Sequence, residues 1–382
     1  MVAGHLQGSA STATMAADTE PALPDYGGAC ICNVVPALLE PGPEPPAWLP
    51  APAVDAEQVV LLLLDGVGWE QLQARPTVAP TMTAMAGGPI ATVLPTTTAT
   101  ALTSLTTGTP PGEHGVIGYR VSVEGEVLNV LRWSTRKGDA RPTVPPGEMQ
   151  PQPAFAGHRP PVVTRAEFAT TGFTGAHLEG GRFRGWRMPS SLVTECAQLV
   201  RSGEPFTYAY YDGVDKVAHE YGLGEHYDAE LAAADRLVAQ VLDAVPAGTC
   251  VVVTADHGQV DTGDDVVPVA GEVLAHVSYQ SGEGRFRWLH ARPGRARALR
   301  DAAEAAHGHQ AWVRTRDELV DQGWFGPRVT ADARSRLGDV ALVAKGTIAF
   351  TEPTDGGPYV LIGRHGSATT AELLVPLLAA RA

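Results

Sequence analysis

The chain has 382 residues, of which 44% are hydrophobic and 18% charged, and its formal net charge is -14. This acidity argues against a sequence-independent nucleic-acid binder, because such proteins neutralise phosphates with Lys and Arg. The four cysteines are too few and too irregularly spaced for a disulfide framework, and no run approaches the roughly 18 apolar residues of a membrane span. We therefore expect a cytoplasmic protein that binds neither nucleic acid nor a membrane.

The first segment, residues 1–54, is rich in Pro, Ala and Gly and contains no apolar stretch of signal-peptide length. We expect it to form a leader that lies on the surface of the domain without contributing to its core. Met15 is an alternative first residue, so the true start codon stays open.

Beyond residue 54, short apolar runs alternate with helical stretches. The runs, which are typical of buried strands, are 58–64, 90–94, 206–211, 250–254 and 339–344. In 226–245 apolar residues recur at helical spacing instead. This alternation predicts an α/β fold with a mostly parallel central sheet flanked by helices. In such folds the functional site lies beyond the carboxyl ends of the strands.

Two stretches interrupt the alternation. Residues 119–133 predict a hairpin that turns at Glu124-Gly125. Residues 263–335 contain the patterns of a strand, a helix, a second strand and a second helix. We interpret them as an inserted, smaller α+β lid. The lid would divide the catalytic core into a first part, 55–262, and a second part, 336–382, which contains the strand 339–344.

Carboxylates and imidazoles follow three of these apolar runs and a further short apolar run before His365, and we expect all of them to reach the same edge of the sheet. The residues are Asp65, Asp215, His219, Asp256, His257 and His365. A single Asp after a strand is usually a turn residue or a helix cap. Burial of this many unneutralised carboxylates would cost several kcal/mol each, and divalent cations would remove that cost. Asp and His ligands without a thiolate suit zinc best, with manganese or iron as alternatives.

A threonine-rich stretch, residues 95–108, follows the run 90–94 and is expected to open a helix. Hydroxyl groups at a helix N-terminus lie near free N–H groups and the positive end of the helix dipole. The stretch is therefore either an N-cap or the source of a metal-activated nucleophile. Three adjacent threonines, residues 96–98, leave that choice open.

Five motifs together resemble the alkaline phosphatase superfamily, and most closely its nucleotide pyrophosphatase/phosphodiesterase-like branch. They are LLLLDGVG, LPTTTATALTSLTTGTPPGEHGV, YDGVDKVAHEYG, TADHG and RHGS, within residues 55–260 and 336–382. The resemblance implies a large α/β core, two zinc ions and a threonine nucleophile. The chain lacks Cys-x-Pro-x-Arg and Asp-Ser-Ala, so the sulfatase and alkaline phosphatase branches themselves do not fit.

The resemblance also implies roles for individual residues. The metal ion that activates the nucleophile would be held by Asp65, Thr98, Asp256 and His257, and the second by Asp215, His219 and His365. The family pattern around Pro95, Gly108 and His114-Gly115 selects Thr98 as the nucleophile. Tyr119 stands where phosphodiesterases of this family usually have an Asn that binds a phosphoryl oxygen, and we expect it to bind substrate.

The implied function is a metal-dependent hydrolase of small phosphate esters or nucleotides, with diesters or pyrophosphates as the expected substrates, that forms a phospho-threonine intermediate. The alternatives are a phosphonate hydrolase or phosphomonoesterase on the same scaffold, a metal-dependent phosphomutase, and a non-catalytic protein that binds phosphate ligands. The physiological substrate, the resident metal and the oligomeric state stay open.

Overall fold

The structure, a computed structural model, describes residues 20–352 and 360–382. Within these residues seven strands form the central sheet in the order β2-β19-β10-β1-β9-β7-β8. In that order the strands span Ala86–Ala91, Leu374–Arg381, Cys250–Thr254, Val59–Leu64, Phe206–Tyr211, Pro161–Arg165 and Arg182–Trp186. Neighbouring strands are parallel except that β19 runs antiparallel to β10 and to β2. The predicted α/β fold is confirmed, with a mixed sheet in which one strand is reversed.

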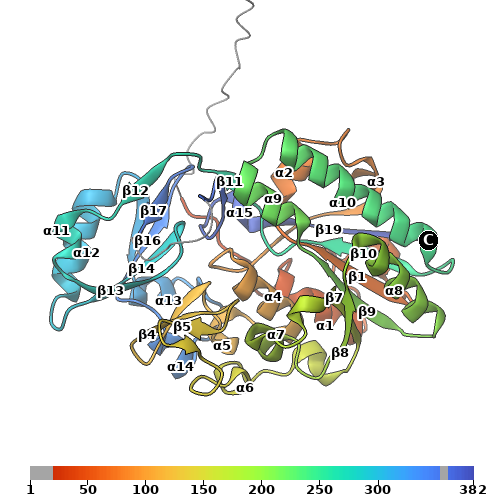
Figure 1. Cartoon of the computed structure of the whole chain (residues 1–382), viewed down its shortest axis with the longest axis horizontal. Coiled ribbons are helices and arrows are strands. Elements are labelled where there is room, and N and C mark those ends of the chain that lie inside the picture. The colour runs from red at the N-terminus through yellow and green to blue at the C-terminus, as the bar shows by residue number, and fades with distance from the viewer. Residues whose placement is uncertain (1–19, 353–359) are drawn as a thin grey trace, which may run out of the picture.

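Helices cover both faces of the central sheet (Figure 1). On one face α10 (Glu225–Ala244), which matches the helix predicted over 226–245, packs against α3 (Pro80–Ala84), α8 (Pro189–Arg201) and α9 (Gly213–Tyr221). On the other face α4 (Thr98–Thr107) packs against α1 (Val34–Leu39), α5 (Pro111–His114) and α7 (Gly172–His177). The short helices α2 (Trp69–Gln73) and α15 (Thr370–Leu373) contact each other.

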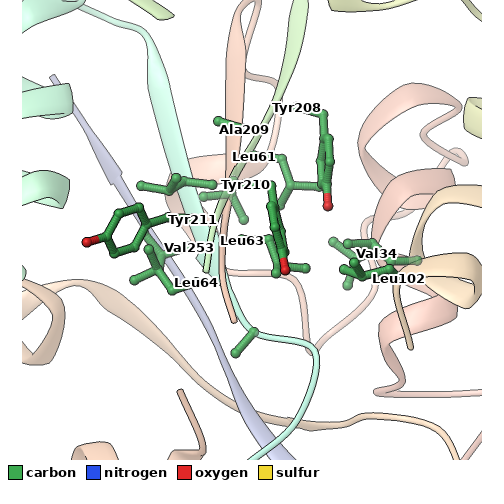
Figure 2. Close-up of a cluster of buried hydrophobic side chains, with 14 of the residues drawn as sticks. Val34, Leu61, Leu63, Leu64, Leu102, Tyr208, Ala209, Tyr210, Tyr211 and Val253 are labelled. Carbon is green, nitrogen blue, oxygen red and sulfur yellow. The ribbon is translucent and has the colours of Figure 1, made fainter. Parts of the chain in front are cut away.

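Burial on both faces explains the continuous apolar sequence of the central strands. Figure 2 shows Leu61, Leu63, Tyr208 and Tyr210 projecting toward α1 and α4, whereas Leu64 and Tyr211 project to the opposite side. Every residue of β1 and of β9 is buried. The predicted runs 206–211 and 250–254 coincide with β9 and β10, while β2 begins before the predicted run 90–94 and includes only its first two residues.

A second sheet has the order β13-β14-β16-β15 and is antiparallel throughout. Its strands span Val277–Gly282, Phe286–Ala291, Val340–Ala344 and Ala311–Thr315 in that order. They are accompanied by α11 (Gly271–Leu274), α12 (Ala296–His307), α13 (Arg316–Asp321) and α14 (Ala331–Ser335). We call residues 271–344 the smaller unit; Figure 1 shows it beside the central sheet.

The expectation that the run 339–344 belongs to the core is wrong, because β16 pairs with β14 and β15 in the smaller unit. Ala341 and Val343 face a cluster that contains Trp288 and Trp324, whereas Val340, Leu342 and Ala344 face a second cluster on the other side. Both faces of β16 are therefore buried. A continuous apolar run records that burial and does not identify the sheet to which the strand belongs.

The leader was also expected to stay outside the core, and its described part does not. Cys30, Ile31, Cys32, Val34 and Val35 are almost completely buried in the main hydrophobic core. They form a short 3-10 helix, η1 (Ile31–Asn33), and the start of α1, and both pack on α4. The Pro- and Ala-rich average composition of residues 1–54 conceals this local apolar stretch.

Three further sheets complete the fold of the described residues. The predicted hairpin is β3 (Arg120–Val123) and β4 (Glu126–Asn129), extended by β5 (Ser134–Thr135) and β6 (Gly138–Asp139). Two-stranded sheets join β11 (Val260–Asp261) to β18 (Gly363–Arg364), and β12 (Val266–Pro268) to β17 (Ala349–Thr351). None of the helices in the described part of the chain combines the length and apolarity that a membrane crossing requires.

Candidate metal centre

Gly66 allows the ends of two parallel strands to meet. Asp65 follows β1 directly, and Gly66 adopts a left-handed φ of 75°. A Cβ atom on Gly66 would lie 2.9 Å from the Cα of Asp215, at the start of α9 beyond β9. The Asp65 carbonyl accepts a hydrogen bond from the Asp215 N–H at 3.1 Å. Only a residue without a side chain lets the two acidic segments approach this closely.

Three oxygen atoms converge on one histidine nitrogen. The Nε2 atom of His257 lies 3.1 Å from Thr98 Oγ1, 3.3 Å from Asp256 Oδ2 and 3.5 Å from Asp65 Oδ1. Neither carboxylate oxygen has a hydrogen-bond donor among the residues that the structure describes. A single imidazole nitrogen carries at most one proton and cannot satisfy three oxygens. The donor set fits a divalent cation bound among these four groups.

A second group of contacts joins the other three predicted ligands. Asp215 Oδ1 lies 3.4 Å from His219 Nε2 and 3.8 Å from His365 Nε2, and the two histidine nitrogens are 3.3 Å apart. The rings of His257 and His365 stack with their centroids 3.5 Å apart. His257 therefore reaches both groups, and its ligand atom lies within 4.8 Å of those of Asp215 and His365. The seven predicted ligand groups form one contiguous centre.

The three histidines present their Nε2 atoms to this centre because backbone carbonyls hold their Nδ1 atoms. His257 Nδ1 contacts the Gly258 carbonyl at 3.1 Å, and His219 Nδ1 contacts the Gly363 carbonyl at 2.7 Å. His365 Nδ1 contacts the Thr96 carbonyl at 2.8 Å. A carbonyl oxygen only accepts, so each Nδ1 carries the proton and each Nε2 keeps its lone pair. This arrangement is typical of histidines that bind metals.

His365 reaches the centre by a route that the sequence did not indicate. The short apolar run before it was expected to deliver His365 to the same edge of the sheet as the other ligands; the first residue of that run, position 359, lies outside the described residues. The described part leads into β18, which pairs with β11 directly after the His257 segment. His365 therefore arrives from a two-stranded sheet above the carboxyl edge of the central one.

Burial and mutual repulsion make the ionised carboxylates unfavourable when no cation is present. Burial, followed by the charges of Asp256 and Asp215, raises the pKa of Asp65 well above its usual value. Burial likewise raises the pKa of Asp215 and of Asp256. Burial, followed by the neighbouring His257, lowers the pKa of His365 well below its usual value. A bound cation would reverse these penalties, since it favours ionised carboxylates and neutral imidazoles.

The three adjacent threonines have different surroundings. Thr96 Oγ1 donates to the Ser367 carbonyl at 2.7 Å and accepts from the Gly366 N–H at 3.0 Å, so it holds the segment that carries His365. Thr97 is the N-cap residue of α4, without a side-chain cap hydrogen bond. Thr98 is the first residue of α4, and its hydroxyl is the one that lies against His257.

The predicted substrate residue, Tyr119, lies outside the hydrogen bonds and ion pairs that join the seven groups in the described part of the chain. Its hydroxyl accepts a hydrogen bond from Asn129 Nδ2 at 2.6 Å. The preceding residue, Gly118, donates its N–H to Thr100 Oγ1 in the first turn of α4 at 2.8 Å. Arg120 forms an ion pair with Glu352 at 3.2 Å. Asn129 was not predicted from the sequence. A hairpin that turns at Glu124-Gly125 nevertheless places it opposite Arg120, the residue after Tyr119.

Two further buried residues that the sequence analysis missed support the centre. Glu372 pairs with Arg285 of the smaller unit, and both side chains are fully buried. The Glu372 backbone carbonyl accepts from the Gly258 N–H at 2.9 Å, next to His257. Gln259 donates from its side chain to Asp215 at 2.8 Å. Neither residue follows a pattern that predicts a functional site, because both act through contacts between segments distant in sequence.

His114, which belongs to the motif that selected Thr98, has a structural role. Its Nδ1 accepts from the Val116 N–H at 3.0 Å and its Nε2 contacts Ser104 Oγ at 2.8 Å, which ties α5 to α4. Burial, with the nearby Arg336 charge, lowers the pKa of His114 to about 3, so the ring is neutral.

Comparisons with known proteins identify the fold and the family of the chain. No curated protein matches the chain by sequence. Among solved structures, murine ectonucleotide pyrophosphatase/phosphodiesterase 5 has a TM-score of 0.64 at 14% identity, over 84% of this chain and 87% of that chain. An inactive threonine-to-alanine variant of it in complex with AMP has a TM-score of 0.63 at 14% identity, over the same 84% and 87%. Phosphonoacetate hydrolase from Sinorhizobium meliloti, in complex with phosphonoformate, has a TM-score of 0.61 at 18% identity, over 85% of this chain and 90% of that chain.

These likenesses show the fold. The sequence profile of the type I phosphodiesterase/nucleotide pyrophosphatase family matches residues 59–195 and 203–368, which is most of the chain and includes all seven predicted ligands. The chain belongs to the type I phosphodiesterase/nucleotide pyrophosphatase family, a family of phosphoric ester hydrolases within the alkaline phosphatase superfamily.

Proposed function

We propose that the protein is a metal-dependent hydrolase of phosphate diesters or nucleotide pyrophosphates and that Thr98 is its nucleophile. The observation that carries the proposal is the convergence of Thr98, Asp65 and Asp256 oxygens on His257 Nε2. A hydroxyl that shares a site with two unpaired carboxylate oxygens and a neutral imidazole is placed for activation by a cation.

Two divalent cations would bind. Asp65, Thr98, Asp256 and His257 would hold one, and Asp215, His219 and His365 would hold the other. The donors include no thiolate, which favours zinc and leaves manganese and iron as alternatives. When bound, the cations would supply the positive charge that lowers the pKa of a hydroxyl or a water molecule and offsets the charge of the phosphoryl group.

The protein's own groups would perform the following steps. The Thr98 hydroxyl loses its proton to solvent, and its oxygen attacks phosphorus as the bond to the leaving oxygen breaks. The first turn of α4 has no intrahelical acceptors for its N–H groups, so these can donate to a phosphoryl oxygen. Water then cleaves the bond between Thr98 and phosphorus, which releases the phosphoryl product and regenerates the hydroxyl.

Diesters and pyrophosphates fit the surroundings better than monoesters do. A monoester brings more negative charge and needs additional cationic donors near the nucleophile. The cationic residue next to Tyr119, Arg120, is paired with Glu352. Tyr119 offers a hydroxyl and a ring face on which a nucleobase can stack. The AMP complex of the murine neighbour supports a nucleotide substrate, and the phosphonoacetate hydrolase neighbour makes phosphonates the second candidate.

Two further parts of the proposal concern the smaller unit and the location of the protein. The smaller unit would act as a lid that shapes substrate choice, and the hydrogen bond of 2.9 Å between Tyr279 on β13 and Ser122 on β3 supports this. That bond links the unit to the hairpin that follows Tyr119. A cytoplasmic location is supported by the four cysteines, which are all buried and unpaired.

The experiment compares Thr98→Ala with Thr97→Ala, a matched loss of a neighbouring hydroxyl. We expect Thr98→Ala to abolish hydrolysis of bis(p-nitrophenyl) phosphate while it retains the fold and most of the bound metal, and Thr97→Ala to change the rate only mildly. Metal analysis should find close to two ions per chain in the parent protein. A dead Thr97→Ala variant beside an active Thr98→Ala variant, or full activity of the parent in excess chelator, would refute the proposal.

A further inference from the structure

Gln259 is a fully buried polar residue in direct contact with a predicted metal ligand. It lies two residues after His257, directly before β11, and its side chain is shielded from solvent. Its Nε2 atom donates to Asp215 Oδ1 at 2.8 Å. That oxygen is the one that lies 3.4 Å from His219 Nε2 and 3.8 Å from His365 Nε2. Gln259 therefore contacts the Asp215 oxygen that faces His219 and His365.

The surrounding chain holds this amide in one place. The Gln259 backbone carbonyl accepts from Gln71 Nε2 at 2.5 Å. A Cβ atom on Gly66 would lie 2.7 Å from Gln259 Nε2, and one on Gly363 would lie 2.8 Å from Gln259 Oε1. The amide thus fills a slot between the segment that follows Asp65 and the residue whose carbonyl orients His219.

The energetic balance explains why an amide occupies this slot. The Oε1 atom of Gln259 is buried and has no donor among the residues that the structure describes. An unpaired buried carbonyl is costly, and an apolar side chain of similar shape would avoid that cost. The compensating contact is the hydrogen bond to Asp215. A neutral N–H donor favours the ionised form of this buried carboxylate without adding a charge that repels a cation.

We infer that Gln259 is a positioning residue, which fixes the Asp215 carboxylate and thereby sets the affinity of the metal ion held by Asp215, His219 and His365. The inference rests on the proposed function. Groups that hold a metal ligand by hydrogen bonds typically contribute about 10–100-fold to metal affinity. Gln259→Met keeps the length of the side chain and removes the N–H donor, so we expect a loss of that size for one of the two metal ions.

The test is a competition titration of metal-free protein with a zinc-chelating dye, which yields a dissociation constant for each zinc ion. The parent is compared with Gln259→Met and with a matched control, Gln280→Met. Gln280 is also a buried glutamine whose Oε1 has no donor among the described residues, and it lies in the smaller unit. We expect one of the two dissociation constants to increase about 10–100-fold in Gln259→Met alone. The melting temperature of the metal-free protein should stay unchanged.

A second readout separates positioning from general damage. In saturating zinc, Gln259→Met should regain most of the parent kcat, because the weakened site is then filled. Both constants within twofold of the parent would overturn the inference about Gln259 while leaving the proposed function intact. An equal increase in both dissociation constants, together with a lower melting temperature, would assign Gln259 a purely structural role. A parent protein that binds none of zinc, manganese and iron would instead refute the proposed function itself.

Discussion

The buried ion pair between Arg285 and Glu372 should control stability more strongly than any other ion pair discussed above. Arg285 Nε and Nη2 donate to the two Glu372 oxygens at 3.0 Å and 2.6 Å. The Ser367 N–H and the Thr369 hydroxyl donate to the same carboxylate at 2.9 Å and 2.6 Å. The carboxylate therefore joins the smaller unit to the segment that follows His365. We predict that Arg285→Met will leave it buried without a counter-charge.

The magnitude follows from the burial of both partners. Removal of one partner of a buried ion pair costs about 3–5 kcal/mol. An unfolding entropy of about 2.1 cal/mol/K per residue gives about 0.8 kcal/mol/K for the 382 residues. The melting temperature should therefore fall by about 4–6 °C. The double variant Arg285→Met/Glu372→Gln should recover much of this loss, because it removes the unpaired charge and keeps an acceptor for the Ser367 N–H.

Thermal unfolding followed by circular dichroism measures the effect, on protein loaded with metal to the same content. Arg334→Met provides the control, because Arg334 and Asp317 form an ion pair at 2.6 Å with both side chains exposed to solvent. Such a pair contributes little, about 0–1 kcal/mol. A melting temperature for Arg285→Met within 1 °C of the parent would show that the buried pair is not a major source of stability. A double variant less stable than Arg285→Met would contradict the charge-based explanation.

Three further predictions concern pH, substrate choice and the smaller unit. Burial lowers the pKa of His177 to about 4, so this residue contributes stability above its unfolded pKa of about 6.5 that is lost as the pH falls toward 4. In urea unfolding, the stability difference between pH 7.5 and pH 5.0 should be smaller by about 2 kcal/mol in His177→Phe, and an unchanged difference would contradict this. The ratio of kcat/KM for a nitrophenyl diester to that for its monoester should show a diester preference. This preference should decrease from the parent to Tyr119→Phe and further to Tyr119→Ala. Equal preferences in all three proteins would show that Tyr119 does not contact the substrate. Loss of the bond between Tyr279 and Ser122 in Tyr279→Phe should change KM more than kcat or metal content, whereas a loss of metal would show that the smaller unit supports the centre directly.

The sequence alone was sufficient to predict the α/β fold and the residue types of the candidate site. The runs at Phe206–Tyr211 and Cys250–Thr254 are apolar throughout, because the strands that they form are buried on both faces. Asp65 directly follows the strand β1, and Asp256 follows β10 after a single residue, so parallel strands bring them to one edge of the sheet. These inferences rest on short, contiguous patterns, which are the features that a sequence presents directly.

Tertiary structure decided the features that depend on contacts between distant segments. An apolar run records burial on two faces but not the neighbours that provide it, so β16 was assigned to the wrong sheet and Cys30–Val35 to the surface. Thr96 and Thr98 are chemically alike in sequence, and they differ because one contacts Ser367 and the other His257. Side-chain direction and hydrogen-bond partners are set by packing across residues far apart in the chain, and no local pattern encodes them.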